Sequence, residues 1–566
     1  MAPDLSGDVI DRLDQLAAID ADRVLIVELI DGAEESASLS AGSLRARADA
    51  VSVQLAERGV AAGDVVLLIA TSPVECLVGL FGCMRSGVIA APIAFPRRPE
   101  HLDTRLEPVR ANAGAVAVLA GSAQDDAERE VLALLAKGEL PVLRTDVPVL
   151  DGDRPPGVAG SARDIAYLQY TSGSTSDPKG VIVTHDNLVA NFGCIAERLG
   201  VDHRSVIVNW NPLTHDMGLI MGALPAIAYG ASVVLMPPGA FIRRPLSWLR
   251  AIDRHRGTHG YSPNFGYDLL VERTTSEQRA ELDLSCMTCL LNGAEQVRLR
   301  TRERFFDVFA PSGIRRSAWR TAWGLAESTV LVSATPVGAS APVLWVDAAA
   351  LEDRRVIVVP EGTRGARSLC GDGVAASGYD VAIVDESTSV RVPYDRVGEV
   401  WLRGPSVSPG YWKRPDETAA AFGARIADEG DEPWLRTGDL AFLLDDEIVF
   451  CGRLKDLIVL NGRNLHPQDI ELTAGLAHDA VRPGGVAAFP IDADDGEAIV
   501  VLVEVEDPGD EVVAAEVRTA VRRAVLREFE VRVADVALVG PRGVPKTSSG
   551  KVQRVASREI YARHAS

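Results

Sequence analysis

The sequence predicts an α/β protein with a large N-terminal domain and a small C-terminal α+β domain. Its 566 residues are too many for one hydrophobic core. Helical and strand patterns alternate along the first part of the chain, which is typical of strands that helices cover on both faces. The composition then changes near residues 343 and 452, which indicates a β-rich subdomain and a separate C-terminal unit.

The N-terminal domain is expected to span residues 1–452 and to consist of mixed α/β subdomains. Its clearest unit is a helix followed by a strand at Val65–Ala70, with Gly59 between them. The apolar face of that helix carries Leu44, Ala48, Val51 and Leu55.

One uncharged run, from Met217 to Ile242, is long enough to span a membrane. Glycine and proline interrupt it, so we expect instead a buried helix that ends near Gly230 and a buried strand at Ser232–Met236. We therefore expect no membrane span, and the N-terminus has no signal-peptide pattern.

A β-rich subdomain is expected over about residues 343–450, where Val, Gly, Asp and Pro are frequent. Its short strands include Arg355–Val359 and Val381–Val384. The boundary to the C-terminal domain, residues 457–566, is expected near Gly452–Asp456. The C-terminal domain is predicted from a strand at Glu497–Val505, a strand at Val531–Val539, and a helix between them that is lined by Val513, Val517, Val521 and Val525.

The composition excludes some classes of function. A net charge of −21 argues against a nucleic-acid binder, which needs a basic surface. Cys286 and Cys289 are a lone pair within a segment that reads as a buried strand, so we interpret them as core thiols rather than half of a metal site. A reducing cytoplasm fits this cysteine usage.

The strongest local motif is Tyr170-Thr-Ser-Gly-Ser-Thr-Ser-Asp-Pro-Lys-Gly180, which lies between two apolar runs. A loop rich in Gly, Ser and Thr offers backbone N–H groups and hydroxyls to an anion, and Lys179 adds positive charge. The glycine and lysine spacing is not that of a Walker motif. Phosphate binding is favoured over a flexible polar hairpin.

Four further motifs carry one candidate residue each, and each has a structural alternative. His215 opens an apolar segment, and Glu327 follows Trp323-Gly324 and could hold Mg²⁺ through oxygen. Asp439 follows a glycine turn and could accept ribose hydroxyls, while Lys551 in a Gly/Ser/Thr loop could neutralise a phosphate or carboxylate. In the same order, the structural alternatives for these four residues are a helix cap, an acid at a helix N-terminus, a turn aspartate and a solvated tail.

Together, in their order and spacing, these motifs resemble the adenylate-forming enzymes, which include acyl-CoA synthetases, luciferases and peptide-synthetase adenylation domains. The resemblance covers about residues 40–560 and is strongest to fatty acyl-AMP ligases. Segment Leu344–Gly371 is similar to an insertion of that branch, which is associated there with poor use of coenzyme A and delivery to an acyl carrier protein. The segments that carry the resemblance are Leu168–Thr175, His215–Leu219, Ser262–Phe265, Leu291–Glu295 and Asn461–Glu471.

The resemblance implies that the enzyme uses ATP and Mg²⁺ to convert a carboxylic acid, expected to be fatty, into acyl-AMP. The acyl group then passes to the phosphopantetheine thiol of an acyl carrier protein. The mobile C-terminal domain would rotate about a hinge at residues 453–456, which contains Lys455. The implied nucleotide-binding residues are Thr171, Ser172, Gly173, Ser174, Thr175, Lys179, Gly293, Ala294, Glu295, Trp323, Gly324, Asp439, Arg453 and Lys551.

The same resemblance implies the catalytic and acyl-binding roles. Glu327 would ligate Mg²⁺, Arg453 would bind ribose or phosphate, and Lys551 would bridge the substrate carboxylate and the α-phosphate. The acyl pocket would contain His215, Asp216, Met217 and Asn264. Two positions depart from the branch: Trp323 stands where Tyr is usual, and Thr214 where larger residues are usual.

Three other functions stay open at this point. An acyl-CoA synthetase shares the first step, and an amino-acid adenylating enzyme could use Asp216 to anchor the α-amino group. A non-catalytic nucleotide-binding regulator is disfavoured because both Lys551 and Glu327 are present. The sequence does not define the length of the acid, the carrier protein or the oligomeric state. A basic run between Arg243 and Arg256 is a candidate docking patch, with a solvated face as its alternative.

Overall fold

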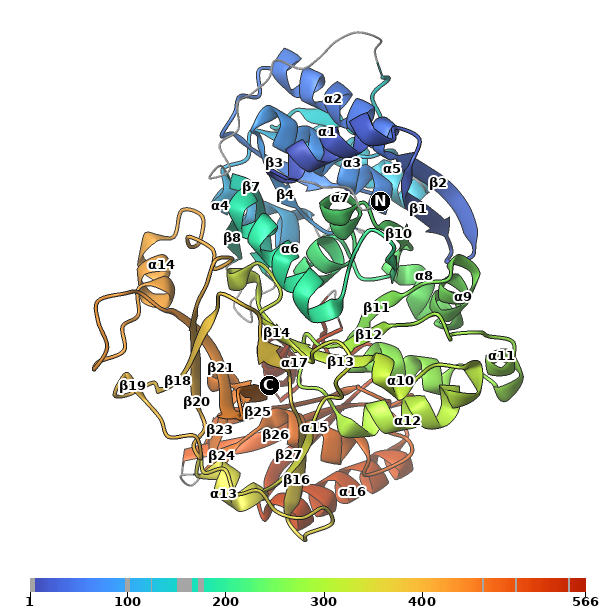
Figure 1. The fold of residues 1–566 in the computed structure, drawn as a ribbon. Coiled ribbons are helices and arrows are strands. Elements are labelled where there is room, and N and C mark those ends of the chain that lie inside the picture. Colours follow the sequence, from blue (N-terminus) through green and yellow to red (C-terminus); the bar gives the residue numbers. More distant parts are fainter. Residues whose placement is uncertain are drawn as a thin grey trace.

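Two large sheets, one three-stranded sheet and two two-stranded sheets organise the described part of the protein in the computed structural model (Figure 1). The structure describes residues 6–96, 102–123, 125–149, 165–171, 178–460, 463–493, 496–547 and 550–565. The large N-terminal part fills the top and middle of Figure 1, and the small C-terminal domain, coloured orange to red, lies below it. This mixed α/β arrangement confirms the predicted fold class.

A six-stranded sheet runs in the order β6 (Val142–Arg144), β5 (Ala117–Ala120), β3 (Val65–Ile69), β4 (Ile89–Pro92), β7 (Ile165–Thr171) and β8 (Lys179–Thr184). The paired strands are parallel except for the β7–β8 hairpin, which is antiparallel. The predicted helix and strand near residues 44 and 65 are confirmed as α2 and β3. The helices of this region are α2 (Ala41–Glu57), α3 (Pro73–Ser86), η1 (Leu102–Leu106), α4 (Glu107–Ala113) and α5 (Asp126–Leu135).

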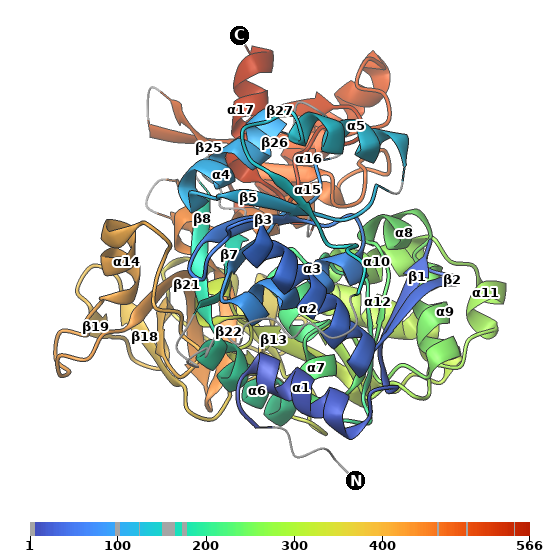
Figure 2. The same ribbon diagram turned by 90° about the horizontal axis from the view of Figure 1, so that it is seen from above.

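Both faces of this sheet are covered, which explains why β3 is buried along its whole length. Figure 2 shows α2 and α3 on one side of β3 and α4 on the other. Val66 and Leu68 of β3 pack in the core that contains α2 and α3, while Val65, Leu67 and Ile69 pack in the core that contains α4.

The parallel half of the second sheet runs in the order β1 (Val24–Ile30), β10 (Ser232–Leu235), β9 (Val206–Asn209), β11 (His259–Ser262), β12 (Cys289–Asn292) and β13 (Trp319–Trp323). Strand β2 (Glu34–Ser40) closes its edge in antiparallel pairing. The α-helices around it are α1 (Val9–Ile19), α6 (His185–Leu199), α7 (Pro225–Tyr229), α8 (Pro238–Arg243), α9 (Leu246–His255), α10 (Asn264–Glu272), α11 (Ser276–Ala280) and α12 (Leu299–Phe309). Shorter turns are η2 (Met217–Met221), η3 (Ala310–Ser312), η4 (Arg316–Ala318) and η5 (Ala326–Ser328).

The uncharged run from Met217 to Ile242 folds as η2, α7, β10 and part of α8, largely within the protein core. Among the described residues, no helix is both long and apolar enough to cross a membrane. Cys289 is buried on β12, where burial raises the pKa of its thiol to about 12. Cys286 is half-buried and precedes the strand, so the strand is shorter than the one expected over Leu284–Leu291.

The β-rich region continues the second sheet rather than forming a sheet of its own. Antiparallel pairing passes from β13 through β14 (Ser333–Ala334) and β17 (Val374–Ala375) to β22 (Glu447–Arg453). The outer part of the sheet is β21 (Leu435–Leu444), β20 (Gly398–Arg403), β18 (Asp380–Asp385) and β19 (Val390–Arg391), with α14 (Pro415–Phe422) beside it.

Residues 343–370 form a separate two-stranded sheet of β15 (Val343–Asp347) and β16 (Ala366–Cys370), joined through α13 (Ala348–Glu352). The prediction of a strand at Arg355–Val359 is wrong, because this stretch makes only isolated bridges. Arg354, directly before it, has a positive φ of 58°, and Pro360 directly follows, so the extended stretch is too short for a ladder.

The C-terminal domain has its own hydrophobic core, which contains residues between Ile458 and Val536. Strand β25 (Val486–Ala493) is antiparallel to β26 (Gly496–Glu504), and β26 is parallel to β27 (Val533–Val539) through the crossover helix α16 (Glu511–Phe529). The short segment η6 (Leu454–Asp456) connects this domain to β22. The other elements are β23 (Ile458–Leu460), β24 (Arg463–Leu465), α15 (Pro467–Gly475) and α17 (Arg554–Ala565).

Candidate active site

The candidate residues of the second sheet follow the carboxyl ends of neighbouring parallel strands. The segment that leads to His215 comes after β9, Asn264 after β11, Gly293 after β12, and Gly324 after β13. Since parallel strands end at one edge of a sheet, these residues gather there, which is where such sheets bind ligands.

The predicted phosphate loop lies at the end of the β7–β8 hairpin, where Thr171 and Lys179 are paired. Ser172, Gly173, Ser174 and Thr175 lie outside the described residues. A third extended segment runs along β8: Trp412 N donates to Gly180 O (2.7 Å), and Ile182 N donates to Gly410 O (3.0 Å). This pairing brings Tyr411 to the hairpin.

Tyr411 connects two candidate residues that are far apart in sequence. Its hydroxyl donates to Glu327 Oε1 (2.8 Å), and the Lys179 ammonium lies 5.1 Å from the centre of its ring. The sequence analysis did not select Tyr411. The local signal in the sequence was the glycine before it, Gly410, which has a φ of 146° in the structure.

Asp439 and Arg453 form a pair across the β21–β22 hairpin, where they are directly opposite. Arg453 Nε lies 3.0 Å from Asp439 Oδ1, and the indole of Trp323 donates to Asp439 Oδ2 (2.9 Å). The charge of Asp439 raises the pKa of Arg453. Asp439 is buried, whereas the side chain of Arg453 is 44% exposed and can reach a ligand.

The residues predicted to border adenine lie against one another after β12 and β13. A Cβ on Gly293 would come within 2.9 Å of Ala322 O, and a Cβ on Gly324 would overlap Val330 O. Ala294 has a positive φ of 68°. These close approaches require glycine at both positions, so that the backbone after β12 and β13 packs directly against its neighbours beside Trp323.

His215 and Asp216 form a close pair before η2, with Nδ1 and Oδ1 2.6 Å apart. Asp216 Oδ1 also accepts a hydrogen bond from Met217 N (2.7 Å). Burial opposes the ionisation of Asp216, but the contact with His215, the charge of Lys551 and the hydrogen bond from Met217 together lower the pKa of the carboxyl. Met217, the next residue, is buried.

Lys551 belongs to the C-terminal domain, but its charge interacts with residues of the N-terminal part. Burial and the charge of Arg453 lower the pKa of its ammonium, while Asp216, Glu295 and Asp439 act in the opposite direction. The preceding Gly550 has a φ of 84°, and a Cβ there would overlap the ring of Phe265. The lysine loop is therefore inserted into the site in this domain orientation.

Asn264 is placed differently from a typical pocket residue, because its side chain already has partners. Its amide donates to Gln296 O (2.9 Å) and accepts from Asn292 Nδ2 (2.9 Å) and from Arg298 N (3.1 Å). Its backbone N–H donates to Glu295 Oε1 (2.9 Å). These bonds fix Glu295 beside the site.

Lys455 lies in η6, between the two parts of the protein. Burial and the neighbouring charge of Arg453 lower the pKa of its ammonium. The next residue, Asp456, pairs with Arg554 (2.7 Å), which also pairs with Glu471 (2.8 Å). These two ion pairs connect η6 to α15 and α17.

The hairpin β15–β16 and α13 contact the small domain through two ion pairs, which we name the insertion contact. Glu352 of α13 accepts from Arg463 of β24 through both carboxylate oxygens (2.6 and 2.9 Å). Arg367 of β16 pairs with Asp469 of α15 (2.8 Å) and donates to Gln296 Oε1 (3.2 Å). Residues 343–370 therefore touch both parts of the protein.

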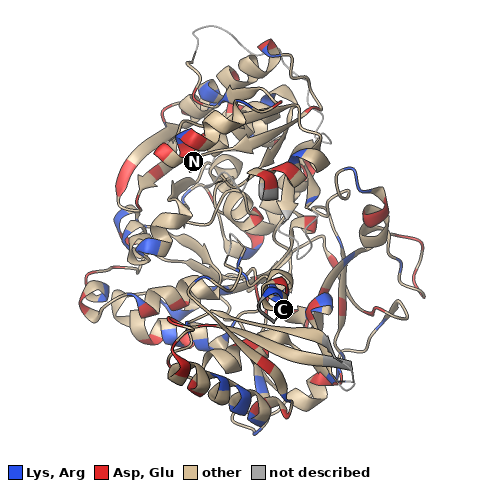
Figure 3. Ribbon diagram, turned by 180° about the vertical axis from the view of Figure 1, so that it is seen from behind, with Lys and Arg blue, Asp and Glu red and all other residues tan. Residues whose placement is uncertain are grey.

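The arginines of the candidate basic patch are mostly neutralised. Ion pairs join Arg243 to Asp31, Arg250 to Glu281, Arg254 to Glu35 and Arg256 to Asp283. Figure 3 shows basic and acidic residues interspersed over one side of the molecule. This finding supports the solvated face over a docking patch.

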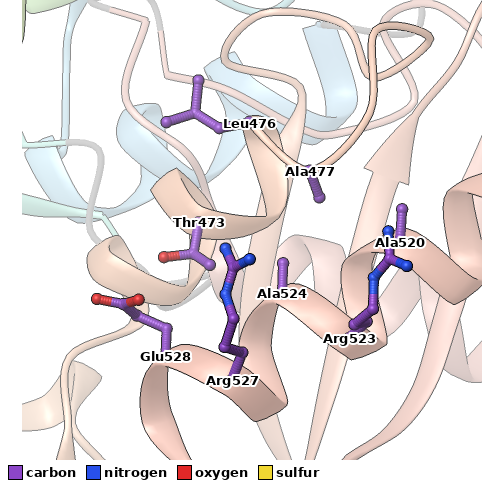
Figure 4. A pocket seen from close by; sticks show the side chains of 8 residues that line it. All are labelled: Thr473, Leu476, Ala477, Ala520, Arg523, Ala524, Arg527 and Glu528. Carbon is purple, nitrogen blue, oxygen red and sulfur yellow. The ribbon is translucent and has the colours of Figure 1, made fainter.

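A pocket of about 290 Å³ lies between α15 and α16 (Figure 4). Its lining includes Arg523 and Arg527 but none of the candidate site residues. We assign it no role in the reaction.

Comparisons with known proteins agree with this geometry. Residues 13–412 match the family model of AMP-binding enzymes, and residues 455–565 match that of the AMP domain of Disco-interacting protein 2-like proteins. The fold and site thus define an adenylate-forming enzyme. The chain belongs to the AMP-binding enzyme family and, within it, to the fatty acyl-AMP ligase branch.

The relatives that place it in that branch match nearly the whole chain. A medium-chain-fatty-acid–[acyl-carrier-protein] ligase, JamA of Moorena producens, is 39% identical, covering 94% of this chain and 91% of that protein. The long-chain-fatty-acid–AMP ligase FadD26 of Mycobacterium marinum is 34% identical, covering 93% of this chain and 91% of that protein. A solved structure from work on fatty acyl-adenylate ligases of E. coli and L. pneumophila has a TM-score of 0.88 at 30% identity. The match covers 100% of this chain and 99% of that chain.

Proposed function

We propose that this chain uses ATP and Mg²⁺ to convert a fatty acid into acyl-AMP and then loads the acyl group onto an acyl carrier protein in the cytoplasm. The observation that carries the proposal is the position of Lys551. A C-terminal lysine lies in one group of charges with Asp216, Glu295, Asp439 and Arg453. This arrangement supports a role for Lys551 as the cation between a substrate carboxylate and a phosphate.

In the first step, an oxygen of the substrate carboxylate attacks the α-phosphorus of ATP, and the bond to the β-phosphate oxygen breaks to release pyrophosphate. Lys179 and the loop after Thr171 would bind the leaving phosphates. Lys551 would neutralise the carboxylate and the α-phosphate as they approach, so the protein acts by positioning and by charge neutralisation.

Glu327 fits a Mg²⁺ ligand, because this ion prefers carboxylate oxygen. Tyr411 occupies Oε1, and within the described part of the chain no hydrogen bond or ion pair reaches Oε2. When bound, the ion would neutralise charge on the phosphates of ATP. Trp323 and the Gly293–Glu295 turn would border the adenine, with Asp439 and Arg453 toward the ribose.

The site favours a fatty acid over an amino acid as the substrate. Asp216, which could have anchored an α-amino group, is already paired with His215 and with the backbone of Met217. The two relatives described above are named as acting on medium-chain and long-chain fatty acids. We propose His215, Asp216 and Met217 as the acyl side of the site.

Segment Leu344–Gly371 supports the carrier protein as acceptor over coenzyme A, because it is similar to an insertion that is associated with poor use of coenzyme A in the fatty acyl-AMP ligases. A segment that touches both parts of the protein restrains the small domain, and that domain must rotate before a thiol can replace Lys551. The name of JamA includes an acyl carrier protein as the acceptor. We propose Lys455 as the hinge residue, with the domain division at residues 453–456.

Removing one ion pair of the insertion contact tests this argument. We expect the double variant Glu352→Ala/Arg463→Ala to form acyl-CoA about fivefold faster than the wild type, because a partly exposed pair contributes about 1 kcal/mol. Removing both partners leaves no unpaired charge. Acyl-CoA and acyl-AMP are measured by mass spectrometry with coenzyme A as the acceptor, and acyl-AMP formation should stay unchanged.

The matched control is Arg391→Ala/Glu429→Ala, which removes another two-pronged ion pair, one whose two residues both belong to the N-terminal part. It should not change the use of coenzyme A. If the Glu352/Arg463 variant is folded and also shows no gain, the insertion contact does not exclude coenzyme A.

A further inference from the structure

Tyr411 is a partly buried side chain with two different contacts at the site. The hydroxyl donates to Glu327 Oε1 (2.8 Å), and the face of the ring receives the Lys179 ammonium at 5.1 Å. Glu327 follows β13 and Lys179 begins β8, so one aromatic residue connects the two large sheets.

The backbone holds Tyr411 in this position from both sides. Gly410 and Trp412 are hydrogen-bonded to β8, and Tyr411 N donates to Thr418 Oγ1 (3.0 Å). The ring packs edge-on against Phe422 of α14, with centroids 5.3 Å apart. The ring therefore cannot turn away without breaking several contacts at once.

We propose that Tyr411 is a positioning residue for adenylation: its hydroxyl orients Glu327 toward Mg²⁺, and its ring holds Lys179 for the phosphates. This inference rests on the proposed roles of Glu327 and Lys179. A donor on one carboxylate oxygen fixes the rotation of the group and directs the other oxygen outward. Such outer hydrogen bonds commonly change metal affinity by about 10-fold to 100-fold.

The chemistry of the phenol suits this task. An ordinary phenol has a pKa of about 10 and is protonated at neutral pH, so its hydroxyl can donate to the carboxylate. The ring attracts the lysine ammonium through its electron-rich face, an interaction that strengthens when both groups are shielded from water.

Two substitutions separate the two contacts. Tyr411→Phe removes the hydroxyl and keeps the ring, whereas Tyr411→Leu removes both. Calorimetry of ATP binding without acid substrate, once with excess Mg²⁺ and once with EDTA, separates the metal-dependent part of the affinity from the metal-independent part. We expect Tyr411→Phe to lower the affinity for Mg-ATP about tenfold and to leave the affinity for metal-free ATP unchanged. Tyr411→Leu should also lower the affinity for metal-free ATP.

Tyr229→Phe is the matched control, because it removes another tyrosine hydroxyl bond, to Phe192 O. It should leave both affinities unchanged, and melting curves should show all variants folded. If Glu327→Gln reduces the Mg²⁺ effect but Tyr411→Phe does not, the positioning role of Tyr411 is refuted while the metal role of Glu327 stands. If Glu327→Gln has no effect either, the proposed metal role itself is wrong, and this inference falls with it.

Discussion

Replacing Lys551 by alanine is expected to lower the rate of acid-dependent pyrophosphate release by about 10²–10³, as when one charge-stabilising contact is lost. The reason is that this ammonium enters the group of charges formed with Asp216 and Glu295 from the other domain. Transfer of the acyl group from preformed acyl-AMP to a carrier protein should remain, because that step does not need a cation at the α-phosphate. Each half-reaction is measured separately with purified variant protein.

The control for Lys551 is Lys546→Ala, which removes an exposed lysine from the same loop. That variant should release pyrophosphate at the wild-type rate. Normal pyrophosphate release by Lys551→Ala would refute the assigned role, and an equal loss of both half-reactions would indicate a general structural defect instead.

Replacing Lys455 by proline is expected to have the second large effect, which falls on the transfer of the acyl group to the carrier protein. Position 455 lies in the first turn of η6, where a proline fits because its missing N–H is not needed. Its fixed φ opposes rotation of the backbone, at a cost of about 3 kcal/mol in an incompatible conformation. Loading of the carrier protein should therefore fall about 10²-fold, while acyl-AMP formation falls far less.

Lys455→Ala is the control, because it removes the charge and keeps the backbone free to rotate. It should load the carrier protein better than Lys455→Pro. Equal losses of both half-reactions in the proline variant, or equal loading by the alanine and proline variants, would contradict a hinge at this residue.

The spacing of apolar residues along short segments was enough to predict several helices and strands. The apolar face from Leu44 to Leu55 and the run at Val65 identified α2 and β3, because spacing alone determines which face is buried. Two apolar runs likewise predicted the two strands on either side of the phosphate loop. The resemblance then identified the enzyme class, since the motifs recur in a fixed order.

Contacts between distant residues could not be read from the sequence. Tyr411 meets Glu327 only because residues 410–412 pair with β8, and no spacing along the chain encodes that pairing. Similarly, the basic residues after Arg243 resemble a patch in the sequence, but their acidic partners, such as Asp31, come from other elements. The stretch after Arg354 had strand-like composition, but it makes only isolated bridges with residues far from it in sequence, such as Arg396.

The most direct test of the proposed function is to supply two acceptors side by side. The protein is incubated with Mg-ATP and carboxylic acids of increasing length, with coenzyme A in one set and a phosphopantetheinylated carrier protein in the other. Mass spectrometry follows acyl-AMP and both thioesters. We predict that acyl-AMP accumulates with fatty acids and that only the carrier protein is loaded; ready formation of acyl-CoA would contradict the proposed function.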